Sequence, residues 1–286
     1  MSEAQLKWGR TGTRVGFQLL TYLLLSLCAV IFIFPFLWML SGSLKPAGQI
    51  MRFPPVILPE LSTLSFNSYA RLFQAVPFAR WLLNSAIVSI SWVCGALLVN
   101  SMAGYALSRL RFRGRDMVLM IFIMTLMIPF QIVMIPAFII TNWLRWVDTY
   151  LALIIPWIPN AFSIYFLRQY FLTIPRELEE AAILDGLNKM QIFYRIITPL
   201  AIPAIVTIGI MTFMWAWDDF LWALIVTRSK ELWVVQLGIA NFFGQYMNAW
   251  DVVMAGATIA ALPTYLLFLL LQRYYVQGVA LSGMKS

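Results

Sequence analysis

Apolar residues in this chain gather into six long runs, separated by shorter polar connections. A bilayer core about 30 Å thick is crossed by roughly 20 apolar residues in a helix, and each run is of about that order. The runs are Val15–Leu40, Trp81–Leu107, Met117–Thr141, Leu151–Leu167, Leu200–Val226 and Val252–Leu271. Only the fifth run contains acidic residues, Asp218 and Asp219. The pattern predicts an all-α, polytopic membrane protein with six transmembrane helices.

The composition agrees with this pattern and leaves little room for a domain outside the membrane. Hydrophobic residues make up 62% of the 286 residues and charged residues only 11%, whereas a soluble domain is about 25% charged. We therefore expect one transmembrane domain over residues 1–286. The first run is longer than the apolar core of a signal peptide and no small-residue cleavage site follows it, so we expect a retained helix.

The net charge of +8 would suggest nucleic-acid binding in a soluble protein. Here the basic residues stand at the ends of the apolar runs, where they orient helices and contact anionic lipid, so we expect no nucleic-acid partner. With both termini in the cytoplasm, 13 of the 20 Lys and Arg residues lie inside. The short Arg109–Arg115 segment, with four arginines, favours that orientation most, although Arg80 argues mildly against it.

Several kinds of chemistry are excluded by residue type. The chain has no histidine, which removes histidine-based catalysis and histidine-ligated metals. Its two cysteines, Cys28 and Cys94, lie inside apolar runs and have no metal-ligand spacing. No phosphate-binding loop of the Gly-x4-Gly-Lys-Ser/Thr type is present. We expect no metal, no catalytic residue and no cofactor bound by this chain.

One connection, at about residues 172–199, is charged and patterned as a helix–turn–helix. Pro175 suits a first helical turn and Gly186 suits the end of that helix. Asn188 and Gln191 match a capping box that starts a second helix. The exposed small and apolar side chains of such a loop could insert into a groove on a partner. The pattern fits equally an interfacial helix pair without a partner.

The same loop resembles a known family. The run Glu180-Ala181-Ala182-x3-Gly186-x9-Ile196-x2-Pro199 looks like the EAA loop of permease subunits in binding-protein-dependent ABC importers, with Thr198 where that family has leucine. Asn84-Ser85, the run Gly104–Arg109, and Trp217-Asp218-Asp219-Phe220 resemble the carbohydrate branch, as does the tail at Arg273–Val279. The pattern is most similar to the second permease subunit of maltose-type systems.

The resemblance implies a set of partners. These are a second permease subunit, two copies of an ATPase subunit that bind ATP and Mg, an extracytoplasmic sugar-binding protein and membrane lipid. It implies a bacterial or archaeal plasma-membrane location and an EAA loop between the fourth and fifth helices that docks on the ATPase. The docking residues would be Glu179, Glu180, Ala181, Ala182, Asp185, Gly186, Leu187, Ile192 and Phe193.

The acids of the fifth run suggest a second candidate site. Ionisable groups inside a membrane span are costly and point to function. On a helix, Trp215, Asp219 and Trp222 fall close to one face with Thr212, and together with Asp218 they could line a translocation path. The structural alternative is an acid at the interface that reaches water or pairs with Arg228. Two rival functions stay open: a proton-coupled carrier that uses these acids, and an intramembrane enzyme, which the missing histidines disfavour.

Overall fold

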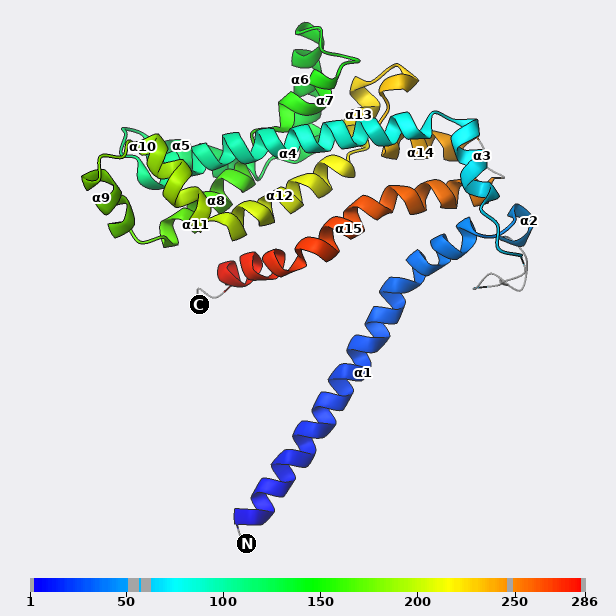
Figure 1. Cartoon of the computed structure of the whole chain (residues 1–286), viewed down its shortest axis with the longest axis horizontal. Helices are drawn as coiled ribbons and strands as arrows, with labels where there is room; N and C mark the ends of the chain where they lie inside the picture. The colour runs from blue at the N-terminus through cyan, green and yellow to red at the C-terminus, as the bar shows by residue number, and fades with distance from the viewer. Residues whose placement is uncertain (1–2, 51–56, 58–62, 246–248, 284–286) are drawn as a thin grey trace. The chain divides into compact units, whose positions relative to one another are not determined.

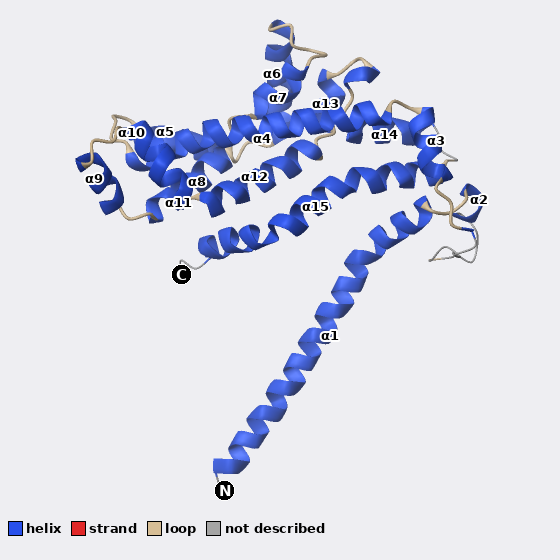
Figure 2. Cartoon of the chain, in the orientation of Figure 1, coloured by secondary structure: helices blue, strands red, loops and turns tan. Residues whose placement is uncertain are grey.

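The computed structural model describes residues 3–50, 57, 63–245 and 249–283. Arg52 and Lys285, which enter the charge count above, lie outside these ranges. Every regular element in the described ranges is helical (Figure 2). The longer helices are α1 (Glu3–Ser43), α3 (Asn67–Ala75), α4 (Phe78–Arg109), α5 (Arg115–Thr125), α6 (Phe130–Trp143), α8 (Ala161–Thr173), α9 (Glu177–Leu184), α12 (Ile202–Trp217), α14 (Val235–Gln245) and α15 (Trp250–Gly283). The short ones are α2 (Ala47–Ile50), α7 (Tyr150–Ile154), η2 (Ile155–Trp157), α10 (Lys189–Ile192), η3 (Phe193–Ile197), α11 (Thr198–Leu200), α13 (Leu221–Val226) and η4 (Lys230–Leu232).

Three helical segments in the described ranges are long and apolar enough to cross a membrane unbroken: Phe17–Ser43, Phe78–Arg109 and Trp250–Gln272. Three further spans are bent helix pairs, which bring the total to six when each pair counts as one span. The bends measure 105° between α5 and α6, 43° between α7–η2 and α8, and 81° between the α10–α11 segment and α12. This architecture confirms the all-α, polytopic prediction.

Each bend lies beside proline. Pro129 precedes α6, Pro156 and Pro159 lie between α7 and α8, and Pro203 lies in the first turn of α12. Proline has no backbone N–H and its ring clashes with the preceding turn, so a helix bends or ends there. The apolar runs predicted one span at each of these places, and the structure has two helices that meet at a bend.

The chain divides into two compact units, one formed by residues 1–75 and 245–259, the other by 76–244 and 260–286. In the smaller unit, Asp251 at the start of α15 is buried and binds α3: Arg71 Nη1 lies 2.7 Å from its Oδ2, and the Ser68 hydroxyl donates to the same oxygen at 3.2 Å. The single-domain prediction stays a prediction.

In the larger unit, α4 lies along α8 and α12 (Figure 1). The helices approach closely at Gly104, where an added Cβ would lie only 3.1 Å from the Arg168 backbone nitrogen and 3.2 Å from the Ile164 carbonyl oxygen. Polar side chains bind the helices together as well, since the Asn100 amide donates to the Ile158 carbonyl at 3.0 Å and accepts from the Asn160 N–H at 3.1 Å. Small residues and interhelical hydrogen bonds of this kind hold membrane helices together where apolar side chains alone give no preference over lipid.

Candidate docking loop and translocation face

The predicted helix–turn–helix is present, and local sequence explains both of its ends. Helix α9 begins beside three acids in its first turn, which complement the positive end of the helix dipole. At its other end the Leu187 N–H donates to the Ala182 carbonyl and the Gly186 N–H to the Ile183 carbonyl, both at 3.0 Å. This bonding pattern is a Schellman motif, and Gly186 supplies the left-handed residue it needs, with φ +83°.

The second helix of the loop also starts as predicted. The Asn188 side chain accepts from the Gln191 N–H, and the Gln191 side chain accepts from the Asn188 N–H, both at 2.9 Å. This reciprocal capping box opens α10, which continues directly into the π-helical turn η3 and then α11. The predictions for Gly186 and for Asn188 with Gln191 are therefore confirmed. The prediction for Pro175 is wrong, because Pro175 precedes the N-cap residue Arg176 and lies outside the first turn of α9.

The two faces of α9 differ sharply. Glu179 and Ala182, three residues apart, are buried, while Glu180, Ala181, Asp185 and Gly186 are exposed. Successive residues turn by about 100° around a helix, so Glu180, Ala181 and Leu184 share the exposed face. Leu184 is 89% exposed. An apolar side chain this open at the tip of a capped helix is available for contact with another molecule.

The remaining predicted docking residues face the chain's own interior. Ile192 and Phe193 belong to a buried cluster with Ala182, and Leu187 is partly buried against it. The other buried members are Tyr105, Leu167, Phe171, Ile174, Ile197, Ala201, Ala204 and Ile208. The Phe193 ring lies 5.2 Å from the Tyr105 ring. These residues fix the loop to α4 and α8, so they orient the exposed face.

The docking set predicted from sequence omitted apolar residues of α9 that the structure exposes. Ile183 is 46% exposed and Leu178 43%, in addition to Leu184. Glu179 and Ala182 are three residues apart and lie on the inward face. Their spacing alone does not show that this face, and not another, is buried. With a helix of two turns, the apolar pattern alone does not fix the face.

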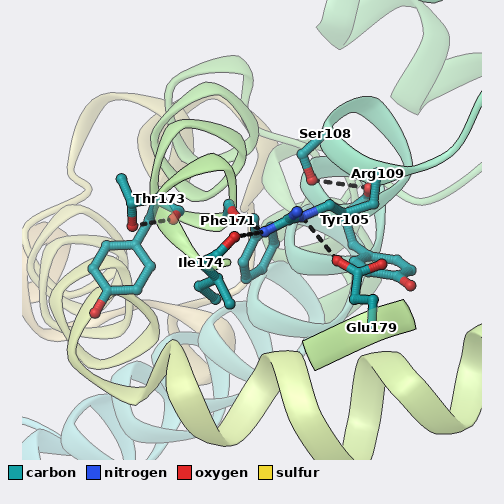
Figure 3. A network of polar contacts seen from close by, with 8 residues as sticks. Tyr105, Ser108, Arg109, Phe171, Thr173, Ile174 and Glu179 are labelled. Atoms are coloured by element: carbon teal, nitrogen blue, oxygen red, sulfur yellow. Dashed lines mark hydrogen bonds and ion pairs between the residues drawn. The ribbon is translucent and has the colours of Figure 1, made fainter. Parts of the chain in front are cut away.

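A buried ion pair connects the loop to α4. The Arg109 side chain, at the end of α4, is 2% exposed, and its Nε lies 3.0 Å from Glu179 Oε1. The same guanidinium donates through Nη2 to the carbonyls of Phe171 and Ile174 at the end of α8 (Figure 3). A pocket of about 330 Å³ opens beside this pair, between α9 and the segment that follows α4. It is lined by Arg109, Leu110, Arg111, Arg176, Glu179, Glu180, Ile183 and Lys189.

The predicted translocation face is not one face of a continuous helix. Helix α12 ends at Trp217, Asp218–Phe220 are non-helical, and α13 starts at Leu221. The expectation of a single face through Trp215, Asp219 and Trp222 is therefore wrong. Aspartate competes for backbone hydrogen bonds and favours helix ends, which explains the break.

The break separates the predicted residues. Trp222 is buried, its indole N–H donates to the Ala152 carbonyl at 2.8 Å, and its ring meets Trp157 edge-on at 5.1 Å. Asp219 accepts from the Trp222 N–H at 3.3 Å. Trp215 and Asp218 are exposed, and Asp218 accepts from the Gln236 amide at 3.2 Å. A role in lining a path stays a prediction, and among these residues the geometry favours Trp215 and Asp218.

Among the described residues, no group of three His, Cys, Asp or Glu side chains comes close enough to hold a metal ion. The fold and the loop together define the class: a polytopic helical membrane protein with a capped helix–turn–helix beside the ends of two spans. The chain belongs to the family described as "Binding-protein-dependent transport system inner membrane component", whose model matches residues 96–281.

The chain is similar over nearly its whole length to proteins of this kind. It is 33% identical to the arabinooligosaccharides transport system permease protein AraQ of Bacillus subtilis (strain 168), over 93% of this chain and 94% of that protein. It is 35% identical to the inner membrane ABC transporter permease protein YcjP of Escherichia coli (strain K12), over 97% and 98%. A solved bacterial ABC transporter involved in the import of the acidic polysaccharide alginate matches with TM-score 0.82 and 26% identity, over 92% of this chain and 98% of that chain. The family resemblance of the sequence motifs is thereby confirmed.

Proposed function

We propose that this chain is one permease half of an ATP-driven carbohydrate importer, coupled to a separate ATPase through the loop at residues 172–199. The observation that carries the proposal is the capped helix α9, which presents Leu184 and its neighbours outward while its other face is fixed to the ends of α4 and α8. A rigid element with an exposed apolar tip suits insertion into a groove on a partner. Relatives named for arabinooligosaccharide, lactose and trehalose transport support the carbohydrate class.

Within the loop, we assign two roles. Glu180, Ala181, Asp185 and Gly186, with Leu184 and Ile183, contact the ATPase because they are exposed. Glu179, Ala182, Ile192 and Phe193 position that surface from the buried side. ATP and Mg bind the two ATPase subunits, and this chain is not an enzyme. ATP-driven closure of the ATPases moves the loop and switches the pathway between its inward-open and outward-open states.

The assembly includes a second permease subunit and an extracytoplasmic sugar-binding protein, which agrees with the family's description as binding-protein-dependent. The chain lies in a bacterial or archaeal plasma membrane as a multi-pass protein with both termini in the cytoplasm. The arginine-rich segment between α4 and α5 supports this orientation, because basic residues in short loops are retained on the cytoplasmic side. The exposed arginines of this segment, Arg111 and Arg113, contact anionic lipid.

The test begins with a mild-detergent purification of the chain from its native membrane, with mass spectrometry of the co-purifying proteins. We expect a second permease and an ATPase that carries a phosphate-binding loop. Recovery of the chain alone, from membranes in which it is active, would contradict the proposal and favour a proton-coupled carrier that uses Asp218 and Asp219.

Reconstitution then tests the activity. The purified complex is placed in liposomes with its binding protein, and uptake of labelled lactose, trehalose, arabinooligosaccharides and alginate oligosaccharides is measured with and without internal ATP. We expect uptake of one of these sugars that requires ATP and does not respond to a proton gradient. Uptake that follows the proton gradient without ATP would overturn the proposed function.

A further inference from the structure

Three helices meet at the Arg109 side chain. Arg109 is the last residue of α4, its Nε pairs with Glu179 of α9 at 3.0 Å, and its Nη2 donates to two carbonyls at the end of α8. Figure 3 shows the guanidinium between the Glu179 carboxylate and the Ile174 carbonyl. Since a guanidinium is planar with donors in fixed directions, bonds to several acceptors define its orientation and theirs.

In the part of the chain that the structure describes, α9 makes few other buried contacts. Its buried residues are Glu179 and Ala182, and alanine offers only one methyl group for packing. Within the described residues, the ion pair is therefore the main side-chain attachment of this helix. It joins α9 to α4, a span of 32 residues that begins at Phe78.

Stability alone does not explain a charged pair at this place. Removing two charges from water is costly, and a well-packed apolar pair of similar size often stabilises a fold as well or better. What an apolar pair lacks is a charge held at one place. Here the hydrogen bonds from Nη2 to the Phe171 and Ile174 carbonyls orient the guanidinium, and its charge attracts the Glu179 carboxylate 3.0 Å away. The geometry at Arg109 suits the transmission of movement.

We propose that Arg109, paired with Glu179, is the positioning residue that transmits displacement of α9 to α4 and so couples ATP hydrolysis to sugar movement. The inference rests on the proposed function and adds a residue to it. When the ATPase moves α9, the guanidinium moves the end of α4 with it. Without the pair, α9 follows the ATPase while α4 lags behind, and hydrolysis proceeds with little uptake.

The test uses the complete reconstituted transporter and the sugar that the wild type takes up best. Arg109→Met together with Glu179→Met removes both charges, so neither is left unpaired, although the two carbonyls at the end of α8 lose the Nη2 donor. ATP hydrolysis per complex should persist, and sugar moved per ATP should fall by about fivefold or more, within the usual range of coupling energies between sites. The matched control is Ser108→Ala, because this neighbouring buried hydroxyl donates only to the Tyr105 carbonyl of its own helix.

Wild-type uptake per ATP in the double variant would overturn the inference, since the pair would then be structural only. If the double variant fails to assemble, Arg109→Lys decides the question. Lysine keeps the charge, but its single nitrogen cannot stand in for Nε and Nη2, which the guanidinium holds apart in one plane. Lower uptake per ATP therefore supports the inference, and an unchanged value overturns it. A wild-type complex without ATP-dependent uptake would instead show that the proposed function itself has failed.

Discussion

Gly186 occupies a backbone conformation, φ +83°, that residues with a side chain adopt only at a cost. An added Cβ at this position would meet no atom within 4 Å, so the space around it is open. In the isolated chain, a substitution at Gly186 therefore lowers folding stability through backbone strain. In the assembly, it also affects the docking of any partner that contacts this turn. The two effects can be measured separately.

We expect Gly186→Arg to abolish ATP-driven uptake while the chain still inserts and folds. Gly186→Ala should lose about as much stability as Gly186→Arg, about 1 kcal/mol, because both place a side chain on a left-handed backbone. It should still retain most of the uptake because its side chain is small. Gly186→Asn, which tolerates this conformation, is the control for strain. Membrane abundance and uptake are measured together, and normal uptake by the arginine variant would exclude a docking role for this turn.

Asp148 joins two connections of the larger unit. Its Oδ1 accepts from the N–H groups of Arg228 and Ser229 at 2.9 and 3.0 Å, and from the Ser229 hydroxyl at 2.9 Å. Burial alone would raise the pKa of this carboxyl, but these three hydrogen bonds and the Arg228 charge outweigh it and lower the pKa below its ordinary value. The residue also has a positive φ of 63°.

Because the pKa of Asp148 is depressed in the folded state, its stabilising effect is fully present above the ordinary aspartate pKa, about 4. That effect is lost as the pH falls through the lowered value. Asp148→Ala should lose about 2 kcal/mol from the missing acceptor, whereas Asp148→Asn keeps both Oδ1 and tolerance of the left-handed backbone. Asp148→Gly removes the side-chain acceptor but tolerates the positive φ, so its stability reports the loss of the hydrogen bonds without added backbone strain. The thermal unfolding midpoint in detergent ranks the stability of the variants. Equal midpoints for Asp148→Ala and Asp148→Asn would refute the role of the Oδ1 acceptor.

At the scale of the element, the break between α12 and α13 is held by Asp219, which accepts from the Trp222 N–H. Asp219→Asn retains this acceptor, so we expect little change in stability or uptake. Asp219→Ala removes it and should cost about 1 kcal/mol, the usual effect of losing a helix cap. Both variants are compared by unfolding and by uptake per complex. A large loss of uptake in the asparagine variant would show that the negative charge itself is required.

The helices follow from the sequence more fully than their interruptions do. Apolar runs of bilayer length predicted six spans, and local chemistry at Gly186 and Asn188 predicted the end of α9 and the start of α10. The break at Asp218–Phe220 was missed because apolar residues on both sides, such as Trp217 and Leu221, continue the hydropathy pattern through it. The pair of Arg109 and Glu179 was missed because it joins residues 70 positions apart, and a contact at that separation cannot be predicted from sequence spacing.

At the scale of the whole molecule, the exposed face of α9 is the surface that we propose for contact with the ATPase. Leu184→Glu should leave the subunit folded, since the side chain is 89% exposed, and should reduce the ATPase recovered with it by about tenfold, as for a central contact residue. Leu178→Ala is the matched control on the same helix, about 120° away around its axis. Co-purification measures both, and equal ATPase recovery from the two variants would place the contact elsewhere.

The attachment of the other end of α4 has a consequence for which substitutions the chain can accept. The Asn84 amide donates to the carbonyls of Glu231 and Trp233 at 2.8 Å, and its oxygen accepts from the Tyr150 hydroxyl at 2.7 Å. Asn84 therefore recognises the Glu231 backbone and makes no use of the Glu231 carboxylate, which is exposed. In a library of all single substitutions, position 231 should accept most side chains, while position 84 should accept almost none.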